Sequence, residues 1–244
     1  MICPNCKTDI PEIAIFCPIC SYKFPLKMAD YTLMRNFAVI ALFSTILSTF
    51  LYYYLFYHPT YHLTDIYESL YLVGVPIFLY SFSLILLRNA YSKLSIGKYI
   101  FSTEQSAATI AAILKVILYL LAFPIIFLFP TPPLSNSLNS ISNLIYAANI
   151  VVSLIFEFGF IKIGIEENSS GMKIAGILYI IGQVISGIIF FLGELIAFDR
   201  ITLTHFPILY LNITGNALLS LGLLEIIVFS IRSKNEYENK KVGN

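Results

Sequence analysis

The segment ISNLIYAANIVVSLIFEFGFIKIGIEENSSGMKIAGILYIIGQVISGIIFFLGELIA (residues 141–197) decides the fold of this chain. It holds two long apolar runs, 141–163 and 173–197, on either side of a short polar turn, IEENSSG (165–171). Because a helix rises about 1.5 Å per residue, each run is long enough to cross a hydrocarbon core about 30 Å thick. Neither run alternates with the period of two that a membrane β-strand needs. The segment therefore predicts a hairpin of two transmembrane helices.

The rest of the chain repeats this pattern. Polar or turn-forming segments separate four more apolar runs, at 37–57, 66–87, 108–129 and 207–231. Of the 244 residues, 58% are hydrophobic and only 12% charged, whereas soluble domains carry about 25% charged residues. We therefore predict an all-α membrane protein with six transmembrane helices between 37 and 231. An N-terminal module (1–24) and a juxtamembrane linker (25–36) precede them, and a cytoplasmic tail (232–244) follows.

The positive charges predict how the chain sits in the bilayer. If the N-terminus is cytoplasmic, thirteen of the fifteen Lys and Arg residues fall in inner segments. Arg200 alone lies in an outer loop, and Lys115 lies within the membrane. Cytoplasmic segments of membrane proteins are enriched in Lys and Arg. Mostly polar residues precede the first apolar run, so we predict no cleavable signal peptide. We expect a multi-pass protein of the cell membrane, in contact with the lipid bilayer, with both termini in the cytoplasm.

All four cysteines of the chain lie in its first twenty residues, MICPNCKTDIPEIAIFCPIC. Cys3 and Cys6 form one CPxC knuckle, and Cys17 and Cys20 form a second one ten residues later. Closed tetrahedral sites with four thiolate ligands are typical of structural zinc. A segment this short cannot bury enough apolar surface to fold alone, so metal binding must supply the folding energy. We predict one structural zinc ion; iron in the same site and a redox pair of cysteines are the alternatives.

The cysteine segment (1–24) resembles the short zinc-ribbon module at the N-terminus of many prokaryotic membrane and regulatory proteins. The likeness rests on the two knuckles together with Pro11, Ala14 and Phe16. That family usually has glycine directly after each knuckle, where the backbone turns left-handed. Lys7 and Ser21 stand there in this chain, which predicts some strain in the turn with the ligands intact.

The charges of residues 1–30 indicate which partner the ribbon could bind. Three lysines and three acidic residues cancel to a net charge of zero. A nucleic-acid-binding surface should be visibly basic, so we do not expect DNA or RNA as a partner. Docking of a cytoplasmic protein, or self-association with a second copy, is the expectation.

Three charged residues interrupt the apolar runs at similar depth, roughly 10 Å from the cytoplasmic boundary by helix rise. They are Lys115, Glu157 and Glu225. An unpaired charge at the centre of a membrane helix costs about 2.5–3.5 kcal/mol on insertion scales, so we expect these groups to face the bundle interior. Lys115 and Glu157 are the natural pair, because their helices form a hairpin. Two interpretations stay open: a buried ion pair that fixes helix register, and a polar cavity for an ion, proton or small solute.

Small residues recur at steps of four and seven along the fifth apolar run. The stripe consists of Gly171, Ala175, Gly182, Ser186, Gly193 and Ala197. Such stripes let helix backbones approach closely in lipid. We expect packing within the chain, with dimerisation through the stripe as the alternative.

The motifs of known enzymes are missing from the sequence, which contains no HExxH, no GxSxG and no Gly-rich phosphate loop. We therefore expect no enzyme. The segments LLRNAYSKLSIGKY (86–99) and FGFIKIGIEENSSGMKIAGILYIIG (158–182) resemble an uncharacterised family of multi-pass proteins from thermoacidophilic archaea. That resemblance implies membership and no mechanism. The expected function is an accessory or scaffold role; the alternative is a transporter or channel for an ion or small solute that uses polar groups of the inner half of the bundle.

Overall fold

The computed structural model describes the backbone of residues 3, 5–9, 17–20, 31–57, 63–96, 99–127, 132–197 and 205–242. Within these ranges it describes the side chains of 3, 5–9, 17–20, 31–51, 74–94, 101–121, 141–188 and 211–235.

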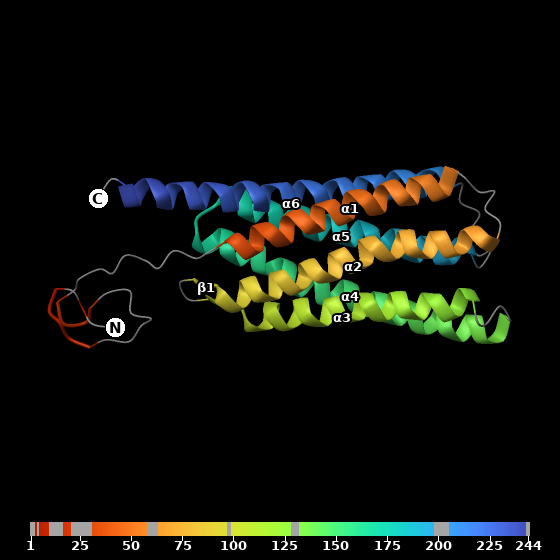
Figure 1. The fold of residues 1–244 in the computed structure, drawn as a ribbon, viewed down its shortest axis with the longest axis horizontal. Helices are drawn as coiled ribbons and strands as arrows, with labels where there is room; N and C mark the ends of the chain where they lie inside the picture. The colour runs from red at the N-terminus through yellow and green to blue at the C-terminus, as the bar shows by residue number, and fades with distance from the viewer. Residues whose placement is uncertain are drawn as a thin grey trace.

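Six helices dominate the fold (Figure 1). They are α1 (Thr32–Tyr57), α2 (Leu63–Lys93), α3 (Ser102–Phe127), α4 (Pro132–Glu166), α5 (Ser170–Ala197) and α6 (His205–Val242). Two strands of two residues each, β1 (Ser95–Ile96) and β2 (Tyr99–Ile100), form an antiparallel hairpin between α2 and α3. All six helices are long and apolar enough to cross a membrane. This confirms the prediction of a helical, multi-pass membrane protein at the level of fold class.

The helices run up and down as one bundle (Figure 1). Each helix packs against its neighbours in sequence, and α1 also packs against α6, which closes the bundle. The start of α1 and the end of α6 therefore lie at the same end of the molecule, together with β1 (Figure 1). Among the described residues, this end carries Lys93, Lys173 and Arg232, three of the basic residues that the sequence assigns to the inner segments.

Aromatic side chains fill the interior of the bundle near this end. The ring centroid of Phe160 lies 6.0 Å from that of Phe37, 6.1 Å from that of Tyr91 and 5.9 Å from that of Tyr179. All four side chains are buried and come from four different helices. Gly159 makes room for this packing, because a Cβ atom at its position would lie 2.4 Å from the Tyr91 hydroxyl. In the described region, rings from α1, α2, α4 and α5 thus pack around Phe160, with Phe37 stacked on it, Tyr91 tilted and Tyr179 edge-on.

Several helices extend beyond the apolar runs. The fourth begins at Pro132 rather than near 141, and proline suits the first turn of a helix because its missing N–H has no partner there anyway. The sixth continues to Val242, through residues that the sequence analysis assigned to a tail. Apolar composition marks the part of a helix that lies in lipid, whereas lysine, arginine and glutamate favour continued helix in water. Figure 1 shows the last turns of α6 projecting past the other helices.

The turn between α4 and α5 sets these two helices side by side. Asn168 adopts a left-handed conformation, with φ of 49°. The Ser169 N–H donates to the Gly164 carbonyl at 2.9 Å, and the Asn168 N–H donates to the Ile165 carbonyl at 3.3 Å. These two bonds form the Schellman end of a helix. The Ser169 hydroxyl then accepts the N–H of Met172 at 3.2 Å and caps the next helix. The polar stretch 165–171 therefore ends one helix and starts the next within three residues.

The same turn is tied to the start of α1. The Tyr31 hydroxyl donates to Oε1 of Glu167 at 2.8 Å, and the Tyr31 ring packs edge-on against Phe229 at 4.9 Å between centroids. Burial, together with the neighbouring Glu167 carboxylate, raises the pKa of Tyr31 well above its usual value, so its hydroxyl stays a donor. Tyr31 thus ties the start of α1 both to the turn between α4 and α5 and to α6.

Candidate metal centre and buried charges of the bundle

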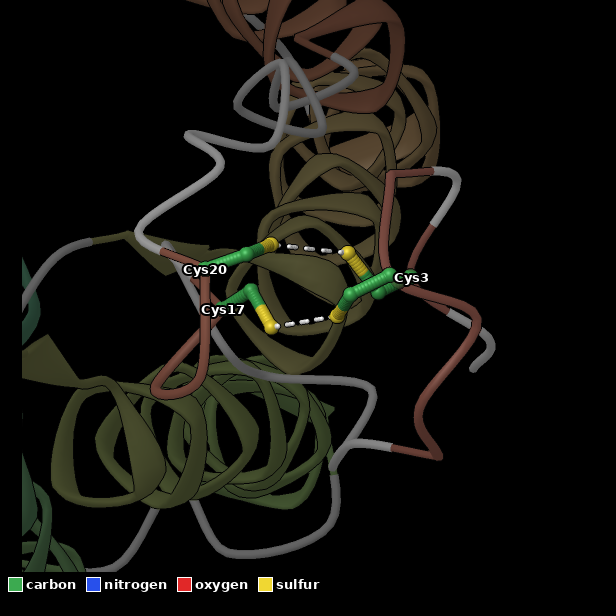
Figure 2. Close-up of side chains that lie close together, drawn as sticks. Cys3, Cys17 and Cys20 are labelled. Atoms are coloured by element: carbon green, nitrogen blue, oxygen red, sulfur yellow. Dashed lines mark hydrogen bonds between the residues drawn. The ribbon is translucent and has the colours of Figure 1, made fainter.

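The two cysteine knuckles face each other (Figure 2). The Cys3 and Cys20 sulfurs are 3.6 Å apart, and the Cys6 and Cys17 sulfurs are 3.4 Å apart. All four sulfurs lie within 4.8 Å of one another. A tetrahedral zinc ion with Zn–S bonds of about 2.3 Å holds its sulfurs about 3.8 Å apart. The four cysteines therefore lie close enough to bind one metal ion, which confirms this part of the prediction.

The backbone of the first knuckle folds tightly around Cys3. Its N–H donates to the Thr8 carbonyl at 2.9 Å, and its carbonyl accepts the Lys7 N–H at 2.8 Å. Lys7 has φ of 60°, a left-handed conformation that glycine adopts most readily. Ser21, the equivalent residue after the second knuckle, lies outside the described residues.

The thiols of the site differ in their affinity for protons. Hydrogen bonds from the hydroxyl and backbone of Thr8 lower the pKa of Cys6 to about 6. The Cys20 N–H lowers the pKa of Cys17, but burial and the neighbouring Cys6 and Cys20 sulfurs raise it, to about 11 overall. Thiolates this close repel each other, so a cation is needed for all four to be ionised together. The donor set thus suits a metal that prefers thiolate.

Replacing Lys7 by glycine should tighten zinc binding about fivefold. A left-handed conformation costs an L-residue about 1–2 kcal/mol, part of which is offset by the greater freedom of glycine in the unfolded segment. Lys7→Ala is the matched control, since it removes the same charge and keeps the strain. Competition of the purified chain with a zinc chelator measures both affinities. Equal affinities for the two variants would contradict the role of strain.

The bundle places Glu157 of α4 deep among other side chains. Its side chain is fully buried, and neither carboxylate oxygen has a hydrogen-bond partner. Lys115 of α3, the partner expected for it, instead holds its ammonium over the ring of Tyr80, 4.5 Å from the centroid. Lys115 and Glu157 interact electrostatically without a direct ion pair. The structure thus places Lys115 and Glu157 in the same region of the bundle, but they do not form a direct ion pair.

The third charge, Glu225 of α6, lies elsewhere. A Cβ atom at Gly171 would be 3.1 Å from Oε2 of Glu225, so this carboxylate sits beside the first turn of α5. The partial positive charge of a helix N-terminus favours a carboxylate at this place. Glu225 is therefore not part of the group around Glu157.

Glu104 and Lys162 form an ion pair that the sequence analysis missed. Glu104 is buried in the first turn of α3, and Lys162 comes from α4 and keeps 37% of its side chain exposed. Oε2 of Glu104 has no hydrogen-bond partner. The expected third helix began at 108 and left Glu104 out, although the two residues lie near the same end of a predicted hairpin. A search for opposite charges at the same depth on the two helices of that hairpin could have found the pair.

Four members of the small-residue stripe lie in the described side-chain ranges, and the structure places them against α6. Cβ atoms added at Gly182 and Gly222 would lie 2.8 Å from the Gly215 carbonyl oxygen and 2.9 Å from the Ala175 carbonyl oxygen, respectively. A Cβ atom at Gly215 would in turn meet the Ser186 hydroxyl at 3.2 Å. The side chains of Gly193 and Ala197 fall outside those ranges.

Comparison of the chain with protein-family models, with curated proteins and with solved structures finds no match. The resemblances to the zinc-ribbon module and to the archaeal membrane family therefore stay predictions.

Proposed function

We propose that this chain is an accessory or scaffold membrane protein whose zinc-bound N-terminal module docks a partner at the cytoplasmic face. The observation that carries the proposal is the convergence of four cysteine sulfurs within 4.8 Å, on a segment next to a six-helix bundle. A closed site with four protein ligands leaves no open position for a substrate, so its role is to fold and stiffen the module. Such a module provides a rigid surface for docking.

The identity of the metal follows from ligand chemistry and compartment. Thiolates select soft or borderline ions, and a four-sulfur tetrahedral set suits zinc or iron. All four cysteines are free, as expected in the reducing cytosol. Zinc has no redox chemistry and suits a structural site, and we assign it here.

The cytoplasmic orientation is supported by the charge pattern. Both termini of the bundle lie at the end that carries its basic residues, and the positive-inside rule assigns that end to the cytoplasm. Ten residues (21–30) separate Cys20 from Tyr31, and the eleven steps from one to the other reach at most about 40 Å when fully extended. The N-terminal module therefore stays close to the membrane surface.

Docking is supported by an exposed apolar side chain between two of the cysteines. Ile19, inside the second knuckle, is 67% exposed. Apolar groups held on a rigid scaffold are good anchors for a protein partner, because little conformational freedom is lost on binding. Ile19 is therefore the side chain at which contact with a protein, either a cytoplasmic one or a second copy, is best tested.

A photocrosslinking residue in place of Ile19 tests this function in cells. We expect discrete crosslinked proteins that disappear when Cys3 and Cys17 are also replaced by serine, because the module then loses its shape. A product of twice the chain mass would identify a second copy as the partner. The same photocrosslinker at Val39, which is exposed on the outer face of α1, is the control and should capture lipid only. Docking would be refuted if no discrete crosslinked protein formed at position 19, or if the products persisted after Cys3 and Cys17 were replaced by serine.

A second candidate function is favoured by a separate observation, the fully buried Glu157 without hydrogen-bond partners. Charged groups inside membrane proteins commonly mark paths for ions or protons. The candidate is transport of an ion or small solute through the bundle.

A further inference from the structure

The surroundings of Glu157 are polar and come from three other helices. Lys115 of α3, Tyr80 and Tyr91 of α2 and Tyr179 of α5 all lie close enough to interact with it electrostatically. The hydroxyls of Tyr80 and Tyr179 are hydrogen-bonded to each other. The Tyr91 hydroxyl donates to the Phe156 carbonyl at 2.7 Å. Every tyrosine hydroxyl of this group therefore has a partner, and the Glu157 carboxylate has none.

An ionised carboxylate in this setting is too costly to leave uncompensated. Burying a charge without a partner costs several kcal/mol, and buried polar atoms in native proteins are almost always satisfied by a partner, a water or an ion. Glu157 lies nine residues, about 14 Å along the helix, from the end of α4 at Glu166. Its side chain has no exposed surface, so bulk water does not contact the carboxylate.

Lys115 is the only basic side chain among these neighbours, yet its ammonium rests on the Tyr80 ring. If the Glu157 charge were uncompensated, attraction in a medium of low dielectric constant would draw the ammonium onto the carboxylate. A cation–π contact is weaker than such an attraction. The observed position of Lys115 suits a Glu157 whose charge is neutralised by something else.

We propose that Glu157 is the centre of an intramembrane site for a small monovalent cation, a proton or a sodium ion, and that Lys115 is its built-in competitor. A single carboxylate can neutralise only one positive charge, so a divalent ion beside the Lys115 ammonium is disfavoured. The oxygen atoms of Glu157 and of the Tyr80 and Tyr179 hydroxyls suit a hard ion. When the cation leaves, Lys115 moves from the Tyr80 ring to the Glu157 carboxylate. The inference rests on the second candidate function and is independent of the metal centre.

Infrared difference spectroscopy on the full chain in nanodiscs tests the site. A protonated carboxyl group has its own carbonyl stretching band, which disappears on ionisation. We expect a band that is lost as pH rises and that is absent from Glu157→Gln. Glu225→Gln is the matched control, because its carboxylate lies apart from the group, and it should keep the band. If sodium chloride weakens the band at constant pH, sodium is an occupant; if it does not, the proton alone occupies the site.

A second variant separates the proposal from a merely structural role. Lys115→Met removes the competitor and should raise the affinity for the cation about tenfold, a typical coupling between two binding events. A structural ion pair predicts the reverse, a destabilised chain with no change in cation affinity. The proposal is overturned if wild type and Glu157→Gln give the same spectra, or if Lys115→Met leaves the affinity unchanged. Flux in proteoliposomes is a separate readout: binding without flux would remove transport and keep the site.

Discussion

Replacing Cys3 and Cys17 by serine should reduce bound zinc from about one ion per chain to none. Each substitution removes one ligand from one knuckle, and the two remaining thiols cannot complete a tetrahedral site. In small zinc modules the binding free energy, about 10–16 kcal/mol, is also the folding free energy, so loss of the metal unfolds the module. The metal content of the purified chain, measured by mass spectrometry, reports the change directly.

The control for this experiment is Ile19→Ser, which alters an exposed side chain of the second knuckle and keeps all four thiols. It should retain the full metal content. The helical circular dichroism signal should be unchanged in the cysteine variant, because the bundle does not depend on the module for its core. Full zinc content in the cysteine variant would contradict the assignment. If the wild-type chain shows the visible absorption of iron bound to thiolates, the metal in the site is iron rather than zinc.

The helices and the cysteine cluster could be read from the sequence because their causes are local. A run of apolar residues long enough to cross a bilayer has few alternatives to a helix, since lipid offers no partners to the backbone. Two knuckles with two intervening residues bring their sulfurs together by short-range geometry. The left-handed conformation at Lys7 was expected from the resemblance to the zinc-ribbon module, which usually has glycine at that position.

The lateral contacts of the buried charges could not be read in the same way. Sequence gives the depth of Lys115, Glu157 and Glu225, but the direction in which each points depends on how all six helices are rotated. Lys115 lies over a ring from α2 and Glu225 beside the first turn of α5, which depth alone could not indicate. The extension of α6 was missed for another reason. Apolar composition indicates which residues lie in lipid, but it does not indicate where the helix ends.

Replacing Gly182 by alanine should destabilise the bundle by about 2 kcal/mol. The added Cβ would lie 2.8 Å from the Gly215 carbonyl oxygen and 2.9 Å from the Leu219 nitrogen. Both are backbone atoms of α6, so they can move only if the two helices separate. Helix propensity alone predicts the opposite sign, a gain of about 1 kcal/mol for alanine over glycine. Overpacking costs up to about 3 kcal/mol and outweighs that gain. Thermal unfolding should show a melting temperature lower by about 6 °C.

Gly171→Ala is the matched control on the same helix. Its Cβ would meet the Glu225 carboxylate at 3.1 Å, and a side chain can shift where a backbone cannot. Its melting temperature should stay within about 2 °C of the wild type. Light scattering in detergent tests the alternative role of the stripe, because a dimer held together by Gly182 would dissociate in Gly182→Ala. If Gly182→Ala keeps its mass but has a lowered melting temperature, the contact lies inside one chain. If both variants have the same melting temperature, α5 and α6 do not approach as closely as this packing requires.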